Sequence, residues 1–190
     1  MKNALFVALF ACLLSVSVLP VRGQEGVPPQ EPDFAGVFML LDSATGKLTP
    51  LERQQMQIET ARSIISGTKL SQTVKGEKST VRLKAGQPID LVVKVPPQGQ
   101  GMDPVAMFQL MTFESKKGRR EVAMVQVKKG IITDRASTGV GESLPFEANK
   151  HGASSVRLAV GQGLAPGEYL VRTTANLAVF CFGVDGATGQ

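Results

Sequence analysis

Cys181 and His151 are the residues with which this chain could build a thiolate nucleophile beside an imidazole base. Cys181 lies in the run AVFCFGV, whose apolar neighbours predict a strand covered on both faces. Burial raises the pKa of a thiol, so Cys181 is predicted to pack in the core and to be a poor nucleophile. His151 stands between Lys150 and Gly152, in a predicted exposed turn. Because the two side chains are predicted to lie apart, the sequence predicts no catalytic residue. No set of side chains in the sequence has metal-ligand spacing, so no metal and no cofactor are predicted.

Carboxylates are the second group of side chains that could do chemistry. Asp134, Glu142 and Glu147 are spaced unlike any calcium-binding loop, so they are predicted to belong to a solvated connection. Catalytic groups are often distant in sequence and adjacent in space. A secreted hydrolase whose site combines Glu114, Asp134 and Glu142 is therefore the alternative to a non-catalytic protein.

A basic run surrounds Gly118, which is predicted to form a hairpin turn because glycine readily adopts a positive φ. The run is predicted to be solvated, with contact to an anionic surface as the alternative. Its basic residues are Lys116, Lys117, Arg119 and Arg120. Single-stranded nucleic-acid sites usually add aromatic side chains that stack on bases, and here Phe113 alone is near. No nucleic-acid partner is predicted.

Composition argues against a carbohydrate site and gives little support to an anionic partner. The chain has no tryptophan and one tyrosine, so it lacks the flat aromatic platform on which sugars stack. Without residues 1–23 the chain keeps 19 basic and 16 acidic residues, which is a net charge of +3. This excess is too small to identify a partner.

The first 23 residues have the layout of a secretory signal peptide. Lys2 precedes an apolar run, and small residues stand before a predicted cleavage after Gly23. A lipoprotein signal acylated at Cys12 is the alternative. The polar, proline-rich residues 24–33 predict a disordered leader. The protein is thus expected to be a bacterial secreted or periplasmic protein, with no transmembrane segment in the mature chain.

Residues 34–190 predict an all-β body, because short segments of alternating apolar residues are separated by glycine and proline turns. The segment 50–65 is ambiguous. Thr49, Pro50 and Glu52 resemble a helix start, whereas Met56 to Ile64 alternate as a strand does. Strand is the prediction and helix the alternative.

Two stretches of the chain are nearly the same: STVRLKAGQPIDLVVK at 79–94 and SSVRLAVGQGLAPGEYLVR at 154–172. They suggest an internally duplicated pair of units of about 75 residues, joined near 96–104. In both copies the arginine, Arg82 or Arg157, alternates with apolar residues and is predicted to point to solvent. The repeat is interpreted as scaffold, with a pair of arginine binding sites as the alternative.

The segment LAPGEYLVRT resembles the corner between the fifth and sixth strands of immunoglobulin-like and prealbumin-like sandwiches. The matching residues are Leu164, Pro166, Gly167 and Tyr169. The resemblance implies that the Tyr169 hydroxyl bonds the backbone of the preceding loop. The chain end, GEYLVRTTANLAVFCFGVD, also resembles a group of uncharacterised secreted bacterial proteins, which implies location and a sandwich fold but no activity.

Together these observations predict an immunoglobulin-like β-sandwich of the secreted or cell-envelope class. Its expected function is non-catalytic binding of an unknown protein or envelope surface.

Overall fold

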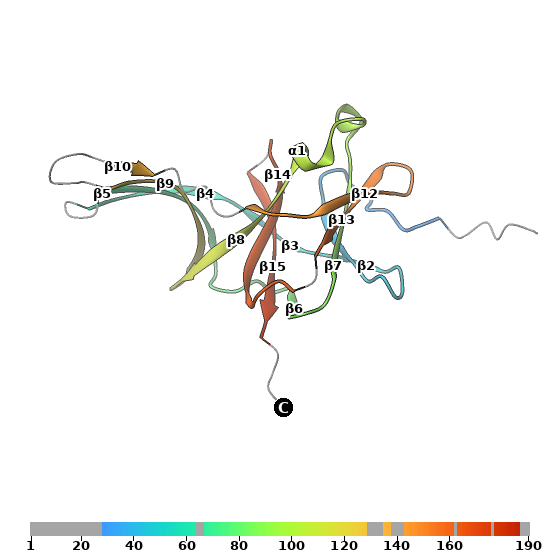
Figure 1. Ribbon diagram of the computed structural model, residues 1–190, viewed down its shortest axis with the longest axis horizontal. Coiled ribbons are helices and arrows are strands. Elements are labelled where there is room, and N and C mark those ends of the chain that lie inside the picture. The colour runs from blue at the N-terminus through green and yellow to red at the C-terminus, as the bar shows by residue number, and fades with distance from the viewer. Residues whose placement is uncertain are drawn as a thin grey trace, which may run out of the picture.

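The computed structural model describes residues 28–63, 67–128, 135–137, 143–161, 163–175 and 177–186. Within these ranges the chain is nearly all β, as predicted, and its strands form two antiparallel sheets with a few short additional strands (Figure 1). Two short helical segments, η1 (Pro97–Gly99) and α1 (Pro104–Met107), lie in the connection between the sheets. No helix in these ranges is long and apolar enough to cross a membrane.

The first sheet has five strands in the order β12-β13-β7-β1-β2. Their bounds are β12 (Glu147–His151), β13 (Ser155–Val160), β7 (Ile89–Lys94), β1 (Phe38–Leu41) and β2 (Leu48–Pro50). The central strand β7 is buried along almost its whole length. Its own isoleucine, leucine and valine side chains point to both faces of the sheet, which is the pattern of a strand covered on both sides.

The second sheet, called here the curled sheet, has the path β3-β15-β14-β8-β9-β5-β4. Its strands are β3 (Glu52–Gln55), β15 (Ala178–Asp185), β14 (Gly167–Thr173), β8 (Phe108–Lys116), β9 (Arg119–Lys128), β5 (Gly67–Lys75) and β4 (Gln57–Ser63). Three short strands pair with this path: β6 (Arg82–Lys84), β10 (Arg135–Ser137) and β11 (Ser143–Leu144). The path begins at β3 and ends at β4, and in sequence only Met56 lies between these two strands. The two ends of the sheet are therefore close together, and the sheet bends back on itself.

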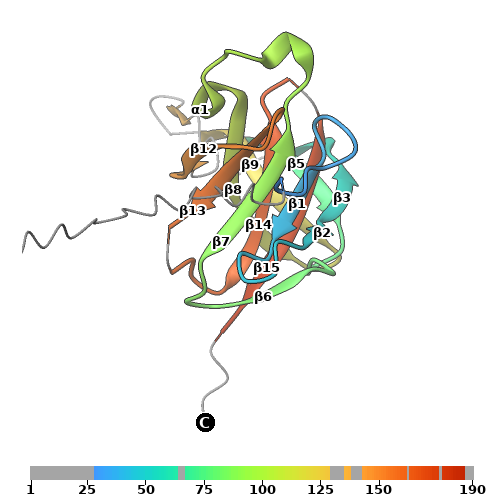
Figure 2. The ribbon, with the colours of Figure 1, turned by 90° about the vertical axis from the view of Figure 1, so that its right-hand side faces the viewer.

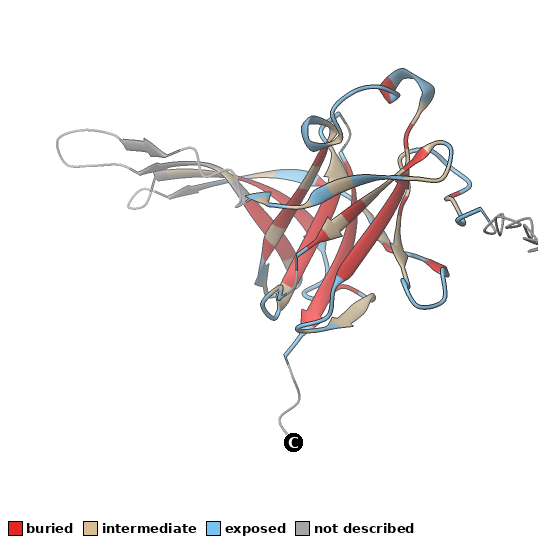
Figure 3. Cartoon of the chain, turned by 45° about the vertical axis from the view of Figure 1, so that its right-hand side comes forward, coloured by how far each residue is buried: buried red, intermediate tan, exposed pale blue. Residues whose placement is uncertain are grey.

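The main core lies between the five-stranded sheet and the outer face of the curled sheet (Figure 2). Phe38, Leu91 and Leu158 from the first sheet meet Tyr169, Phe180 and Phe182 from the second. A smaller core lies on the inner face of the curl, where Met56, Met111, Phe113 and Cys181 pack together. The buried residues therefore follow the strands of the body in both sheets (Figure 3).

One part of the curled sheet leaves the sandwich. The paired strands β4, β5 and β9 continue outward as an arm, to which β10 adds at β9 (Figure 1). At the opposite end of β9, the hairpin that joins it to β8 has Gly118 at φ 77°, as the sequence predicted.

Within residues 50–63 every residue except Leu51 and Met56 lies in a strand, so the strand prediction is confirmed for this described part and the helix alternative is wrong there. The segment pairs with β15 through β3 and with β5 through β4. Each ladder pairs one edge of its strand with the sheet, and these pairings outweigh the local helix-start signal near Thr49.

The predicted disordered leader is in part ordered. Within 24–33, Pro32 is buried, and the Glu31 carboxylate accepts four hydrogen bonds of 2.6–3.1 Å from the β12–β13 loop. Their donors belong to Ala153, Ser154 and Ser155. The prediction failed here because composition does not show that one carboxylate has a matching set of donors far along the chain. Residues 1–27, with the signal-peptide prediction and Cys12, lie outside the described residues.

The two predicted units are not separate bodies. Strands of one unit pair with strands of the other, namely β7 with β13, β5 with β9 and β3 with β15. The predicted join at 96–104 is the crossover that carries the chain from the first sheet to the second. The duplication and the immunoglobulin-like arrangement of the strands stay predictions.

Candidate functional site

A cavity of about 740 Å³ lies at the end of the sandwich next to α1. β7 and β14 end there, and β1, β8 and β15 begin, so loops from both sheets surround it. Most of its walls are apolar, with contributions from Phe34, Val37, Met102, Met107, Phe108 and Phe180. Phe34 is 73% exposed and Met102 is 56% exposed, which places large apolar side chains in contact with solvent beside the cavity.

Three phenylalanines form a rigid apolar base for this cavity. Phe38 packs edge-on against Phe108 at a centroid distance of 5.4 Å and tilted against Phe180 at 5.3 Å. Phe38 itself is fully buried, whereas the other two reach the cavity wall. Their positions are fixed from both sheets, so the base is preformed.

Two cations line the cavity, one from each sheet. Arg53 comes from β3 of the curled sheet and Lys94 from the end of β7. Neither side chain has an ion-pair partner among the described residues. The described residues lining the cavity include no aspartate, glutamate, histidine or cysteine. The cavity therefore combines apolar surface with unpaired positive charge.

Arg53 differs in this respect from the other arginines whose side chains are described. Each of those has a carboxylate or amide partner: Arg82, Arg119, Arg120, Arg157 and Arg172. Several of these partners are buried, so the fold uses most of its arginines internally. Arg53 is the arginine that the described part of the fold leaves available.

Arg120, predicted to lie in a solvated turn, is fully buried. Its Nη2 donates to Glu52 Oε1 at 2.8 Å, its Nε donates to Gly76 O, and its guanidinium lies 5.6 Å from the centre of the Phe113 ring. Its Nη1 has no hydrogen bond and is 3.6 Å from Glu168 Oε2. The prediction failed because β9 alternates at the hairpin and turns this arginine into the curl, where a carboxylate meets it.

The rest of the basic run is also largely neutralised. The buried carboxylate of Glu121 accepts hydrogen bonds from Lys116 and Lys69, each at 2.5 Å. Arg119 pairs with Glu59 at 2.7 Å. Lys117 is exposed and has no ion pair among the described residues. Contact of this run with an anionic surface stays a prediction, and Lys117 is its one residue without an ion pair among the described residues.

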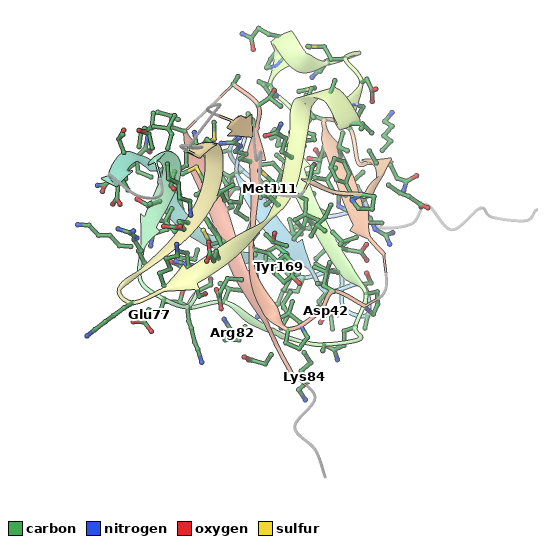
Figure 4. The ribbon with its side chains drawn as sticks, turned by 60° about the vertical axis from the view of Figure 1, so that its left-hand side comes forward. Asp42, Glu77, Arg82, Lys84, Met111 and Tyr169 are labelled. Carbon is green, nitrogen blue, oxygen red and sulfur yellow. The ribbon has the colours of Figure 1, made fainter. Side chains whose placement is uncertain are left out.

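The two repeated arginines are not simply solvated. Arg157 makes a bidentate pair with Asp90 at 2.8 and 2.9 Å. Arg82, which is labelled in Figure 4, pairs with Glu168 and Asp185. Asp90 and Glu168 are buried, and they occupy the same position in the two repeated stretches. Each copy therefore supplies the arginine that pairs with the carboxylate of the other copy. The sequence prediction overlooked these carboxylates because it considered the arginine segments alone.

Substituting Gly183 with alanine should weaken one of these pairs. Gly183 lies on β15 between Arg82 and Glu168, and a Cβ there would overlap the Arg82 guanidinium and lie 2.7 Å from Glu168 Oε1. Displacing Arg82 leaves the buried Glu168 Oε1 without the donor it has in the native protein. We therefore expect the free energy of unfolding to fall by about 1–3 kcal/mol, measured by urea denaturation.

Gly161→Ala is the matched control, because a Cβ at Gly161 meets nothing within 4 Å, and we expect it to change stability by less than about 0.5 kcal/mol. Arg82→Ala and Gly183→Ala should be non-additive, since both remove the same ion pair. Strict additivity of the two would contradict this account.

Tyr169 has the backbone hydrogen bond that the corner resemblance implies. Its hydroxyl donates to Ala165 O at 2.6 Å, and its ring stacks on Phe182 at a centroid distance of 5.4 Å. Burial raises the pKa of the hydroxyl above its usual value. Leu164 packs against the core. Gly167 lies beside the Tyr169 ring, and a Cβ at this position would lie 3.6 Å from Tyr169 Cε2. Pro166 stands before β14, where its missing N–H breaks no ladder.

Cys181 is fully buried, and burial raises the pKa of its thiol to about 12. We expect an aromatic disulfide reagent to label it slowly in the native state and rapidly in urea, because almost no thiolate forms at neutral pH. Labelling of the native protein at the rate of a free thiol would show the burial to be wrong.

The remaining candidate residues do not come together as a site. His151 ends β12, with Nε2 2.9 Å from Gln30 O. Glu114 is exposed beside Lys69 and Lys116, and Glu147 is exposed on β12. Asp134 and Glu142 lie outside the described residues. No group of three or more histidine, cysteine, aspartate or glutamate side chains in the described ranges could hold a metal ion.

Glu52 gives the fold an acid sensitivity. Burial alone would raise the pKa of its carboxyl, but hydrogen bonds from Ser79, Arg120, Gln54 and the backbone of Thr80 lower it to about 2. A lowered folded-state pKa stabilises the protein above the ordinary value of 4.5, and this contribution is lost as the pH falls toward about 2. We expect the urea midpoint to fall across this range, and less steeply in Glu52→Gln. Equal slopes would rule out Glu52 as a cause.

Sequence reasoning missed Arg53, Lys94 and Phe34 as candidate binding residues. Arg53 lies in LERQQMQI, where polar residues fall on both faces of the strand, and this was an available signal of an unusual environment. Phe34 was counted within the body although no apolar alternation surrounds it. The cavity itself depends on how two sheets separate, which no local pattern shows.

Comparison of the chain with protein families, curated proteins and solved structures found no match.

Proposed function

We propose that this protein is a non-catalytic binding protein of the secreted or cell-envelope class, and that it takes up an apolar group in the cavity beside α1. The observation that carries the proposal is the cavity of about 740 Å³ with its preformed phenylalanine base. Small-molecule sites are typically concave, mostly apolar and preformed, with volumes of roughly 300–1,000 Å³.

The described carboxylates support binding over hydrolysis. The best buried of them, Glu52, Asp90, Glu121 and Glu168, each bond to arginine or lysine side chains away from the cavity. A carboxylate held in such a pair is a poor general acid, because the neighbouring cation favours its ionised form. The cavity has no such group among its described residues.

The compartment is proposed from the sequence alone. The charged start, the apolar run and the small residues before Gln24 support export, and the resemblance of the chain end to secreted bacterial proteins points the same way.

Binding is tested with the uncharged apolar dye N-phenyl-1-naphthylamine, whose fluorescence rises in apolar surroundings. We expect a saturable increase with the protein, and a weaker increase in Ala175→Trp, because Ala175 lines the cavity and an indole there would occupy part of it. Ala44→Trp is the control, since Ala44 is exposed in the β1–β2 turn at the other end of β1.

Absence of saturable dye binding, or equal binding by both tryptophan variants, would overturn the cavity as the binding site. Hydrolysis of ester or glycoside substrates by the unaltered protein would instead favour the hydrolase alternative.

A further inference from the structure

The cavity favours a ligand with a long apolar part. Its base is Phe108 and Phe180, both almost fully buried, and its outer wall includes the exposed Phe34 and Met102. Apolar surface therefore extends from the interior to the solvent-exposed rim. A ligand that covers this length contacts the buried phenylalanines and removes the exposed apolar surface of the rim from water, which a small polar solute cannot do.

The same cavity also favours negative charge. Arg53 and Lys94 approach it from opposite sheets, and no carboxylate among the described residues compensates them. Placing an anion beside these two cations breaks no ion pair that the described residues form. Cationic ligands would be repelled by both.

Charge and apolar surface together define one class of ligand. Arginine presents a planar fork of N–H donors that matches the oxygens of a carboxylate or a phosphate, and lysine adds a flexible point charge. We propose that the cavity binds a single-chain amphiphile with an anionic head group, with its tail over Phe108 and Phe180 and its head group at Arg53 and Lys94. This inference rests on the proposed function and names the ligand class for the same cavity.

Displacement of the dye tests the inference with matched amphiphiles. Dodecanoate, dodecanol and dodecylamine share a twelve-carbon tail and differ in charge at the head group. We expect dodecanoate to displace the dye at a concentration at least about tenfold below that of dodecanol, with dodecylamine the weakest. Dodecyl phosphate should compete as dodecanoate does, and acetate, which has no tail, should not compete.

Two charge variants locate the head group. Arg53→Gln and Lys94→Gln keep most of the side-chain length and remove the charge, so each should weaken dodecanoate binding about tenfold and leave dye and dodecanol binding unchanged. Neither residue forms an ion pair within the described ranges, so both variants should fold. Lys117→Gln removes an exposed charge on the β8–β9 hairpin, one that no described carboxylate pairs with, and should have no effect.

The outcomes separate this inference from the proposed function. If the dye binds in the cavity but dodecanoate and dodecanol compete equally, or if neither competes, the anionic-amphiphile inference is overturned while apolar binding stands. Competition by acetate, or loss of dodecanoate binding in Lys117→Gln, would also overturn it. Failure of the dye itself to bind would overturn the proposed function.

Discussion

Arg120→Met should lower the free energy of unfolding by about 3–5 kcal/mol, the range seen when one partner of a buried ion pair is removed. Arg120 is fully buried and is bonded to Glu52 and to two backbone carbonyls, Lys75 O and Gly76 O. Methionine would fill much of the volume but would donate no hydrogen bond. Glu52 would keep its bonds from Gln54 and Thr80 while losing its charged partner. Urea denaturation measures the change.

Lys117→Met is the control for Arg120→Met, because Lys117 is exposed on the same hairpin, and it should change stability by less than about 0.5 kcal/mol. Adding Glu52→Gln to Arg120→Met should recover part of the loss, because an amide is less costly to bury than an unpaired carboxylate. If Arg120→Met were as mild as Lys117→Met, the buried network would not stabilise the fold.

Tyr169→Ala should cost about 3–5 kcal/mol, as other large aromatic truncations in protein cores do. The ring is buried in the main core and stacks on Phe182, so alanine leaves a void between the sheets. Tyr169→Phe keeps the ring and removes only the bond to Ala165 O, so it should cost about 1 kcal/mol.

The difference between the Tyr169 variants separates ring packing from the hydroxyl bond at the corner. Equal losses for Tyr169→Phe and Tyr169→Ala would mean that the hydroxyl bond, not the packing, dominates. The same urea series gives both values.

The sequence was informative where the determining contacts are local or periodic. Alternation predicted the strands, including those within residues 50–65, and the apolar run around Cys181 predicted its burial. Gly118 marked the hairpin because a tight turn there requires positive φ. The corner could be found because Tyr169 bonds a carbonyl only four residues away.

Buried charge was the main error, and its physical cause is long-range pairing. Arg120 meets Glu52 across 68 residues, and Arg157 meets Asp90 across 67. A charged residue in an alternating segment is usually solvated. Only the fold shows that a carboxylate from a distant strand lies within hydrogen-bonding distance of it. The aligned acids Asp90 and Glu168 were the one sequence signal of these pairs.

The position of β15 has a consequence for how the chain folds. This strand, residues 178–185, lies between β14 and β3 in the curled sheet and supplies Phe180, Phe182 and Val184 to the main core. Neither β3 nor β6 has its partner until β15 has been synthesised. Folds dominated by such distant pairings close slowly, because much chain entropy is lost before the contacts form. We expect the nascent chain to stay unfolded until this segment has left the ribosome, and then to acquire its core in one late cooperative step.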